Sequence, residues 1–366
     1  MMNEEKTMIL NMLKDGKISV EEAQALLEAV EEKTGEEETQ HTEEDRLKID
    51  LDEMKESLKD GFRGFGKTME GTIRSVVEGF KSMDFGETVS NAFGSAKATA
   101  EKELILSAEN LSGLNLKTQS GDVTVSGSDS ADVLIQAVVT ARGSDQENAK
   151  KRAEELEIIH EVEDGTLFIK DSGTRMQITG PYSVDYRVTV PRDFNMKLTT
   201  MSGDVAVRKI GAAVGITNYS GDITCRDCSE SVKINTKSGD VFIEGFTGDI
   251  GLRTLSGDIS LSDIVSGTLS CNTLSGDIEG ALNPAAGSSV TAKSLSGDIK
   301  LKIDTSAELG ITAETLSGDI TCGLPVLSAE KKNRRFTAVL NADNGSLNVT
   351  TKSGDISLSP LEKVED

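Results

Sequence analysis

Hydrophobic and polar residues alternate along most of the chain after residue 104, on both sides of a recurring Ser-Gly-Asp triplet. The triplets begin at Ser120, Ser202, Ser220, Ser238, Ser256, Ser275, Ser296, Ser317 and Ser353. From Ser202 onward, successive triplets are separated by 18, 18, 18, 19, 21, 21 and 36 residues. A period near 20 residues is typical of repeat proteins, in which each repeat is one unit of a stacked array.

The apolar residues keep the same positions in nearly every copy. Around Ser256 they are Ile250, Leu252, Ile259 and Leu261, with small or polar residues between them. A period of two predicts strands with one buried face, and the glycine of the triplet suits a turn that needs a positive φ angle. We therefore expect a mainly β fold, a β-solenoid with two strands per coil joined by the Ser-Gly-Asp turn.

The N-terminal part of the chain predicts helices instead. Residues 1–34 predict a helical hairpin, whose second helix begins with a capping box formed by Ser19 and Glu22. The hairpin is too small to bury much surface alone, so it is either a minor appendage or a docking or oligomerisation module. Residues 35–46 are acidic and lack apolar periodicity, which indicates a solvated linker.

Residues 47–103 predict an amphipathic helical segment. Its apolar face consists of Leu51, Met54, Leu58, Phe62, Phe65, Met69, Ile73, Val76, Phe80 and Met83. The mean spacing of these residues is about 3.6, the period of an α-helix. Glycines between Gly61 and Gly79 weaken the helix, so it needs a surface to lie on. The candidates for this surface are the β domain, a second copy of the chain and a membrane interface.

Residues 104–366 predict the β-strand-repeat domain, with an irregular cap over residues 104–195 and regular coils with an end cap over residues 196–366. Within the first cap, Ser144 and Glu147 predict the start of a helix. Strand-like runs in the same cap are Val133–Val139, Leu167–Lys170 and Tyr186–Val190. Because the ends of a stacked array must be closed, both caps are required for a stable domain.

The far end of the array is less regular. We expect the end cap near residues 353–358. The 36-residue step before Ser353 holds either a degenerate coil or a loop that carries basic residues. These basic residues are Lys331, Lys332, Arg334 and Arg335.

Composition and charge narrow the class of protein. The 39 Lys and Arg residues against 62 Asp and Glu residues give a net charge of −23, which argues against nucleic-acid binding. Aromatic residues are 4% of the chain, and 35 glycines fit many short strands with tight turns. No segment has the apolar core of a signal peptide or approaches the roughly 18 apolar residues of a membrane span. We expect a protein that is cytoplasmic or peripheral to the membrane.

The candidates for catalytic or metal chemistry are few. The two histidines, His41 and His160, are far apart in the sequence, which argues against a histidine-based centre. Cys225 and Cys228 form a CxxC motif, but both align with apolar residues of neighbouring coils. Cys271 and Cys322 also occupy inward positions. We therefore expect all four to be small core residues, with no cofactor and no enzymatic activity.

The aspartates of the triplets form a column. Its members are Asp204, Asp222, Asp240, Asp258, Asp277, Asp298 and Asp319. A role in stabilising the turns is the reading that the repeat favours. Calcium bound between coils is the alternative, but the paired glycines of calcium-binding nonapeptide repeats are absent.

A second column is expected on the outside of the solenoid, directly before each serine. It consists of Met201, Tyr219, Leu255, Leu274, Leu295 and Leu316, interrupted by Lys237. A contiguous apolar stripe of this kind often marks a partner-binding surface. The alternatives are that the turn twists these residues inward, or that the N-terminal helical segment covers them.

The sequences around the triplets, such as TLSGDIS and TKSGDV, resemble the putative-adhesin β-strand-repeat family of bacteria. The N-terminal MILNMLKDGKISVEEAQALLEAV resembles the short helical domain that precedes the repeats in YvlB-type and LiaX-type proteins of Gram-positive bacteria. Together the resemblances cover residues 3–34 and 104–358. They imply a non-enzymatic protein of the cell-envelope stress response, linked to sensing antimicrobial peptides.

Two functions therefore remain. The first is a scaffold or regulator that acts through a protein partner, self-association or a membrane surface. The second is an adhesive or glycan-binding β-solenoid at the cell envelope. Glycan sites usually display exposed aromatic residues, and Tyr219 is the main aromatic residue that the pattern places outside. The scarcity of such residues favours the first function.

Overall fold

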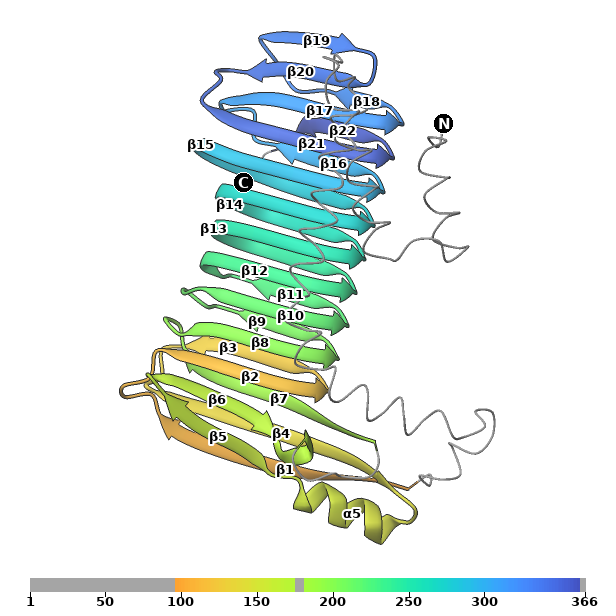
Figure 1. The fold of residues 1–366 in the computed structure, drawn as a ribbon. Helices are drawn as coiled ribbons and strands as arrows, with labels where there is room; N and C mark the ends of the chain where they lie inside the picture. Colours follow the sequence, from red (N-terminus) through yellow and green to blue (C-terminus); the bar gives the residue numbers. More distant parts are fainter. Residues whose placement is uncertain (1–95, 175–180, 363–366) are drawn as a thin grey trace, which may run out of the picture. The chain divides into compact units, whose positions relative to one another are not determined.

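The computed structural model describes residues 96–174 and 181–362, which form one elongated ladder of strands (Figure 1). The predicted hairpin over 1–34, the linker over 35–46 and the apolar helix face from Leu51 to Met83 lie outside the described residues. The helical prediction is wrong for residues 96–103, because strand β1 begins at Ala96. Alternating burial along β1 shows that a strand period has replaced the helical one there.

The fold is mainly β, with a single α-helix among the described residues. In chain order the elements are β1 Ala96–Ser107, β2 Gly113–Ser120, β3 Val123–Ser128, β4 Asp132–Gly143, α5 Gln146–Glu155, β5 Ile158–Glu163, β6 Thr166–Asp171, a 3₁₀ turn Ser172–Thr174, β7 Tyr182–Pro191, β8 Asn195–Ser202, β9 Val205–Arg208 and β10 Val214–Ser220. They continue with β11 Ile223–Arg226, β12 Ser229–Ser238, β13 Val241–Ser256, β14 Ile259–Ser275, β15 Ile278–Ser296, β16 Ile299–Ile303, β17 Leu309–Ser317, β18 Ile320–Cys322, β19 Ser328–Lys332, β20 Arg335–Leu340, β21 Gly345–Ser353 and β22 Ile356–Pro360.

Each Ser-Gly-Asp turn joins two walls of the ladder. Wall 1 consists of the strand segments that end at the serine, and wall 2 of those that begin after the aspartate. Neighbouring strands in each wall are parallel and in register, so that Ser220 pairs with Ser202 on one side and Ser238 on the other. From Val241 onward, β13, β14 and β15 each run from wall 2 through the second corner into wall 1 without a break.

The core lies between the two walls and contains the residues that alternation places inward. Ile250, Leu252 and Ile259 are at most 2% exposed, and Leu261 is 4% exposed. Burying an aliphatic side chain of this size contributes about 1.5–3 kcal/mol relative to leaving it exposed. Because each coil buries its apolar residues against the coils above and below, the core is continuous along the ladder.

The coils are not stacked in the order of the sequence. Strand β21 lies between β15 and β17, because Ser353 pairs with Ser296 on one side and with Ser317 on the other. In wall 2, β22 lies between β16 and β18 in the same way. The chain therefore leaves one coil position empty after Ser296 and fills it with the last triplet. The expected end cap near residues 353–358 is wrong, since these residues are inside the ladder.

The 36-residue step contains a β-hairpin rather than a degenerate coil or a plain loop. Strand β19 pairs with β20, and β20 pairs antiparallel with β17 at the C-terminal end of the ladder. The four basic residues of this step lie on the hairpin. Lys331 and Lys332 are on β19, Arg334 is in the turn and Arg335 is on β20. Charged residues on an exposed edge strand discourage further strand pairing.

The other end of the ladder is more regular than expected. Strands β2 and β3 pair in register with β8 and β9, so the Ser120 copy belongs to the regular coils. Strands β6 and β7 continue the two walls, and β1, β4, β5 and α5 close the end. Helix α5 begins after Asp145, whose carboxylate accepts the Asn148 N–H at 2.8 Å. The predicted Ser144–Glu147 capping box is therefore wrong, because the cap is one residue later.

Candidate interaction surface

The aspartates of the triplets form a hydrogen-bonded ladder between coils. The backbone N–H of Asp222 donates to Oδ1 of Asp204 at 2.8 Å, and the N–H of Asp240 donates to Oδ1 of Asp222 at 2.9 Å. The same bond joins the pairs Asp122–Asp185, Asp204–Asp122, Asp258–Asp240, Asp277–Asp258, Asp298–Asp277, Asp355–Asp298 and Asp319–Asp355. One oxygen of each accepting carboxylate is thus committed to the backbone of the next coil.

This ladder explains the aspartate column without a metal ion. The sequence suggested that the aspartates stabilise their own turns, whereas their carboxylates accept hydrogen bonds from the neighbouring coil. A charge-assisted hydrogen bond offsets the repulsion between stacked carboxylates. Within residues 96–174 and 181–362, no three His, Cys, Asp or Glu side chains form a group that could hold a metal ion.

The glycine of the triplet is required by the same close stacking. Gly239 has φ +123°, a region that residues with a Cβ atom rarely adopt. A Cβ atom at Gly239 would also collide with the carbonyl oxygen of Gly221 in the adjacent coil. Two independent constraints therefore keep this position as glycine.

A third column, which the sequence interpretation missed, lies two residues before each serine. It consists of Thr118, Thr200, Asn218, Thr236, Thr254, Thr273, Ser294, Thr315 and Thr351, all of which are buried. Thr254 donates its hydroxyl to the carbonyl of Ser256 at 3.1 Å, and Thr351 donates to Gly297 at 3.0 Å. The sequence signal was a Thr, Ser or Asn at this position in every copy. These hydroxyl and amide groups satisfy carbonyls at the turn.

Three of the four cysteines are core residues, as predicted, and Cys322 is only partly buried against the core. Cys225 and Cys271 are 0% exposed and Cys228 is 2% exposed, while Cys322 on the terminal coil is half-buried. A hydrogen bond between the thiols raises the pKa of Cys225, and burial adds to this effect. The same bond lowers the pKa of Cys228, and burial raises the pKa of Cys271. Because Cys225, Cys228 and Cys271 are buried, their thiols do not present an accessible nucleophile.

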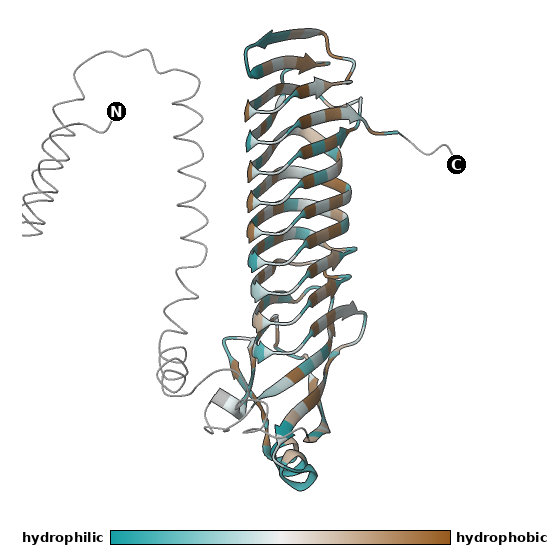
Figure 2. Cartoon of the chain, turned by 90° about the vertical axis from the view of Figure 1, so that its right-hand side faces the viewer, coloured by the Kyte–Doolittle hydropathy of each residue, from teal (hydrophilic) through white to brown (hydrophobic). Residues whose placement is uncertain are grey.

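The predicted partner-binding residues form a column on wall 1, next to the turns; we call it the outer column. Figure 2 faces the edge of the ladder at which this column lies. Tyr219 is 37% exposed, and its ring lies under Lys237 Nζ at 4.2 Å. The other members, Met201, Leu255, Leu274, Leu295 and Leu316, are half-buried.

The outer column is interrupted twice. Lys237 separates Tyr219 from Leu255, as the sequence predicts. Lys352 also stands in the column, because the coil of Ser353 lies between those of Ser296 and Ser317. The expected run of four adjacent leucines is therefore wrong. It is limited to Leu255, Leu274 and Leu295.

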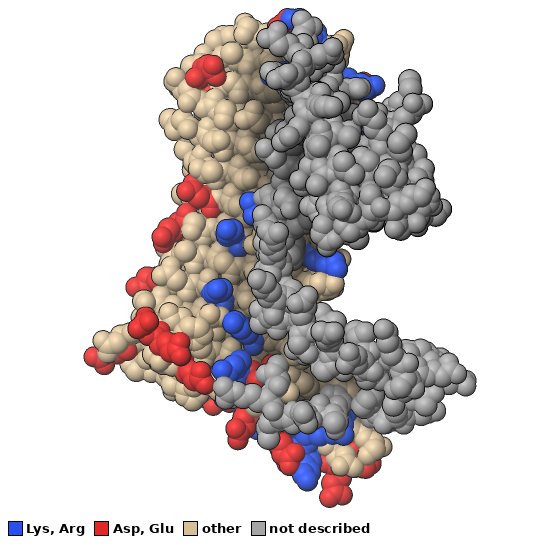
Figure 3. Space-filling model, viewed as in Figure 1, with Lys and Arg blue, Asp and Glu red and all other residues tan. Residues whose placement is uncertain are grey.

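Wall 1 carries an excess of basic residues at its outward positions, which are one, three and five residues before each serine. The basic residues there are Lys117, Lys197, Lys233, Lys237, Arg253, Lys293 and Lys352. The one acidic residue at these positions is Glu314, whose carboxylate contacts Arg335 at 3.0 Å. Figure 3 shows blue Lys and Arg side chains along the middle of this face, with red Asp and Glu side chains toward its edge.

Wall 2 has a shallow groove of about 380 Å³, and charged residues of both signs stand among its outward positions. Its outward residues include Ser260, Ser262, Ser357 and Ser359, whose side chains are small. Phe242 lies at one side, with the Arg226 guanidinium 5.3 Å from its ring centre. Lys300 and Glu279 form an ion pair at 3.1 Å in the same groove. The sequence interpretation did not identify Phe242 as an outward aromatic residue.

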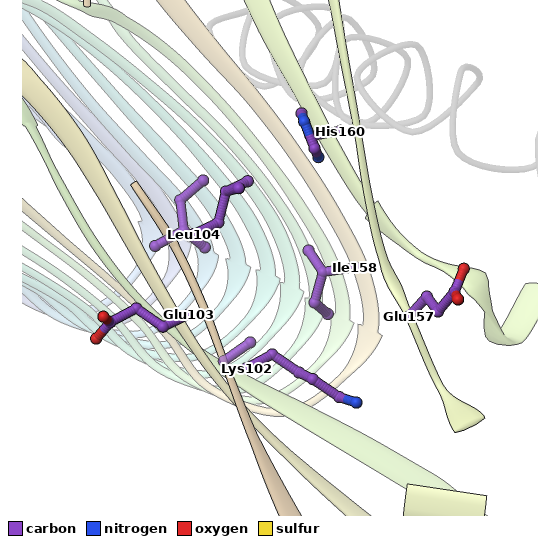
Figure 4. A pocket seen from close by; sticks show the side chains of 8 residues that line it. Lys102, Glu103, Leu104, Glu157, Ile158 and His160 are labelled. Carbon is purple, nitrogen blue, oxygen red and sulfur yellow. The ribbon is translucent and has the colours of Figure 1, made fainter. Parts of the chain in front are cut away.

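A second pocket, of about 280 Å³, opens at the N-terminal end between β1, β4 and β5 (Figure 4). Leu104, Ile135, Ala137 and Ile158 form its apolar part. Its charged residues do not converge, because Glu103 and Glu157 lie on opposite sides and Lys102 Nζ donates to the Glu154 carbonyl at 2.8 Å. His160, one of the two histidines, is exposed at its rim. This arrangement supplies no acid–base pair.

No helix in the described part of the chain has the length and apolar character needed to cross a bilayer.

Among solved structures, the chain is similar to a putative adhesin from Bacteroides fragilis, at 15% identity over 73% of this chain and 98% of that chain, with a TM-score of 0.41. It is also similar to a putative cell adhesion protein from Clostridium sporogenes, at 13% identity over 72% of this chain and 100% of that chain, with a TM-score of 0.25.

A putative lipid binding protein from Parabacteroides distasonis is similar at 11% identity over 73% of this chain and 98% of that chain, with a TM-score of 0.23. None of the curated proteins matches the chain.

Residues 4–35 match the model of a SHOCT-like domain. Residues 111–359 match the model of the Toastrack family, DUF4097, which covers more than half of the chain. The chain therefore belongs to the Toastrack family.

Proposed function

We propose that the protein is a non-enzymatic scaffold or regulator of the bacterial cell-envelope stress response that acts through contacts of wall 1 with a protein or with the membrane surface. The observation that carries this proposal is the charge of wall 1, which has seven basic residues and one acidic residue at its outward positions. The net charge of the whole chain is −23, so the basic residues are concentrated against the overall trend. The resemblance to envelope-stress proteins supports the cellular setting.

The arrangement of charges favours an anionic surface as the partner of wall 1. Each Lys or Arg near an anionic membrane contributes about 1 kcal/mol to binding. The aspartate ladder lies at the turns, and Lys197 is five residues before Ser202, or about 16 Å along the strand. Because charges more than about 8–10 Å apart are largely screened at physiological ionic strength, the ladder does not cancel the charges of Lys197 and Lys233. Lys237 and Lys352, directly before a serine, lie nearer to the ladder.

Vesicle flotation of the full chain tests this proposal. We expect binding to phosphatidylglycerol vesicles that weakens in high salt, and no binding to phosphatidylcholine vesicles. Lys197→Glu with Lys233→Glu should abolish binding. The matched control is Arg208→Glu with Lys302→Glu on wall 2, which should retain it. Equal binding by the two double variants would contradict the assignment of wall 1.

The link to envelope stress needs a separate experiment in cells. The fraction of the protein that sediments with membranes should rise after exposure to a membrane-active peptide. The Lys197→Glu, Lys233→Glu variant should not show this rise. An unchanged distribution of the wild-type protein would argue against a role in the stress response.

The wall 2 groove favours glycan binding as a second candidate function. Serine hydroxyls, the Lys300–Glu279 pair and the face of Phe242 offer hydrogen bonds and a stacking surface for a sugar ring. Binding of envelope glycan fragments to the full chain, lost in Phe242→Ala, would favour this candidate. Binding that is unaffected by Phe242→Ala would place the glycan elsewhere.

A further inference from the structure

The outer column of wall 1 is an apolar surface with a definite shape. Leu255, Leu274 and Leu295 lie on adjacent coils, about 4.8 Å apart, and each is half-buried. The aspartate ladder runs along one side of the column, and five basic residues of wall 1 lie on the other, while Lys237 and Lys352 stand in the column itself. An occupant of this surface must therefore present a narrow apolar stripe.

We propose that residues 47–83 of the same chain cover the outer column. These residues have the only long helical apolar stripe that the sequence predicts, from Leu51 to Met83. As a helix of 1.5 Å per residue, the stripe would extend about 48 Å. The column from Met201 to Leu316 spans seven coil steps, or about 34 Å. The stripe is thus long enough to cover the whole column.

The entry point of the chain into the ladder favours this occupant. Ala98 pairs with Ala141, and Ala141 pairs with Tyr182 at the start of β7. Asp185 follows on β7 and belongs to the aspartate ladder, since it accepts the Asp122 N–H at 3.0 Å. The chain therefore enters the ladder at the edge along which the outer column lies. The twelve residues 84–95, if fully extended, would span about 40 Å.

Charge is compatible with this occupant. Residues 47–83 contain seven basic and seven acidic residues, so the segment has no net charge for the aspartate ladder to repel. The inference is separate from the proposed function, because five of the seven basic residues of wall 1 lie three or five residues before a serine, outside the outer column.

Photo-crosslinking of the full chain in dilute solution without lipid tests the proposal. Leu274 is replaced by p-benzoylphenylalanine in one variant and Leu295 in another, so that the result does not depend on the folding of either one. We expect crosslinks within the monomer to peptides from residues 47–83. The same crosslinker in place of Thr224, on the outward side of wall 2, should give none.

A second change separates docking from chance proximity. Phe62→Glu with Phe80→Glu should reduce the crosslinks at least about tenfold, because it would place charge in an apolar contact. Crosslinked dimers in place of intramolecular products would assign the column to a second copy and overturn the proposal. A third outcome would also overturn the proposal. In it, no crosslinks to residues 47–83 form, and the outer column is shielded only when phosphatidylglycerol vesicles are added. That result would assign the outer column to the membrane. Failure of vesicle binding by wall 1 would leave this result unaffected.

Discussion

The backbone N–H of Asp355 donates to Oδ1 of Asp298 at 2.8 Å, although the two residues are 57 positions apart. Between them lie the coil of Ser317 and the terminal hairpin β19–β20. Asp319, which comes earlier in the chain than Asp355, donates its own N–H to Asp355 Oδ1 at 2.8 Å. The hydrogen-bond ladder thus follows the order of coils in space, and each carboxylate bonds whichever copy is its neighbour.

We expect removal of one carboxylate from the ladder to destabilise the fold. Asp258→Ala removes the acceptor of the Asp277 N–H and should lower the free energy of unfolding by about 1.5–3 kcal/mol. Asp258→Asn keeps an oxygen acceptor and should cost less. Urea unfolding followed by circular dichroism measures both, with the exposed Asp193→Ala as control. Equal losses for the alanine and asparagine variants would show that the bond contributes little.

A methyl group at a turn glycine should be far more harmful than one at a strand glycine. Gly239→Ala introduces strain of about 1–3 kcal/mol at a positive φ angle, in addition to the collision with Gly221. At Gly251, the nearest atom to an added Cβ is the Val232 carbonyl oxygen at 4.0 Å, so Gly251→Ala should be neutral or slightly stabilising. Thermal unfolding compares the two variants. Similar midpoints would contradict the close stacking of the turns.

Loss of a buried hydroxyl beneath the turn should cost a smaller amount. Thr254→Val keeps the shape of the side chain but leaves the Ser256 carbonyl without its hydroxyl donor, which should cost about 1 kcal/mol. Thr217→Val changes an outward residue of wall 1 and serves as control. A shift in the unfolding midpoint for Thr254→Val alone is the expected result. A loss of the same size at Thr217 would point to a general effect of valine.

The thiols should differ in reactivity in the order of their exposure. Cys225 and Cys271 are buried and their pKa values are raised, so at pH 8 they are protonated and shielded from reagents. Burial also raises the pKa of Cys322, but its side chain is half-buried and is therefore the most accessible of the four thiols. Titration with a thiol reagent at pH 8 should detect Cys322 first in the native protein. All four cysteines should react in denaturant; rapid reaction of Cys225 in the native state would contradict a core role.

The alternation of apolar residues by itself determined which side chains form the core. Ile250, Leu252 and Ile259 are buried where a period of two places them, and the cysteines at equivalent positions are buried with them. This works because a strand turns successive side chains to opposite faces, which is a property of the local backbone. The buried threonine column had an equally regular signal, but a polar residue at an inward position does not reveal its carbonyl partner.

Only the tertiary structure decided the order of the coils. Because every copy presents the same turn and the same inward residues, any copy can stack on any other, and local sequence does not distinguish Ser317 from Ser353 as the neighbour of Ser296. The choice depends on the hairpin β19–β20, which occupies the terminal position beside β17. It also places Lys352 in the outer column between Leu295 and Leu316. The composition of that surface therefore follows from long-range stacking, which periodicity along the chain does not encode.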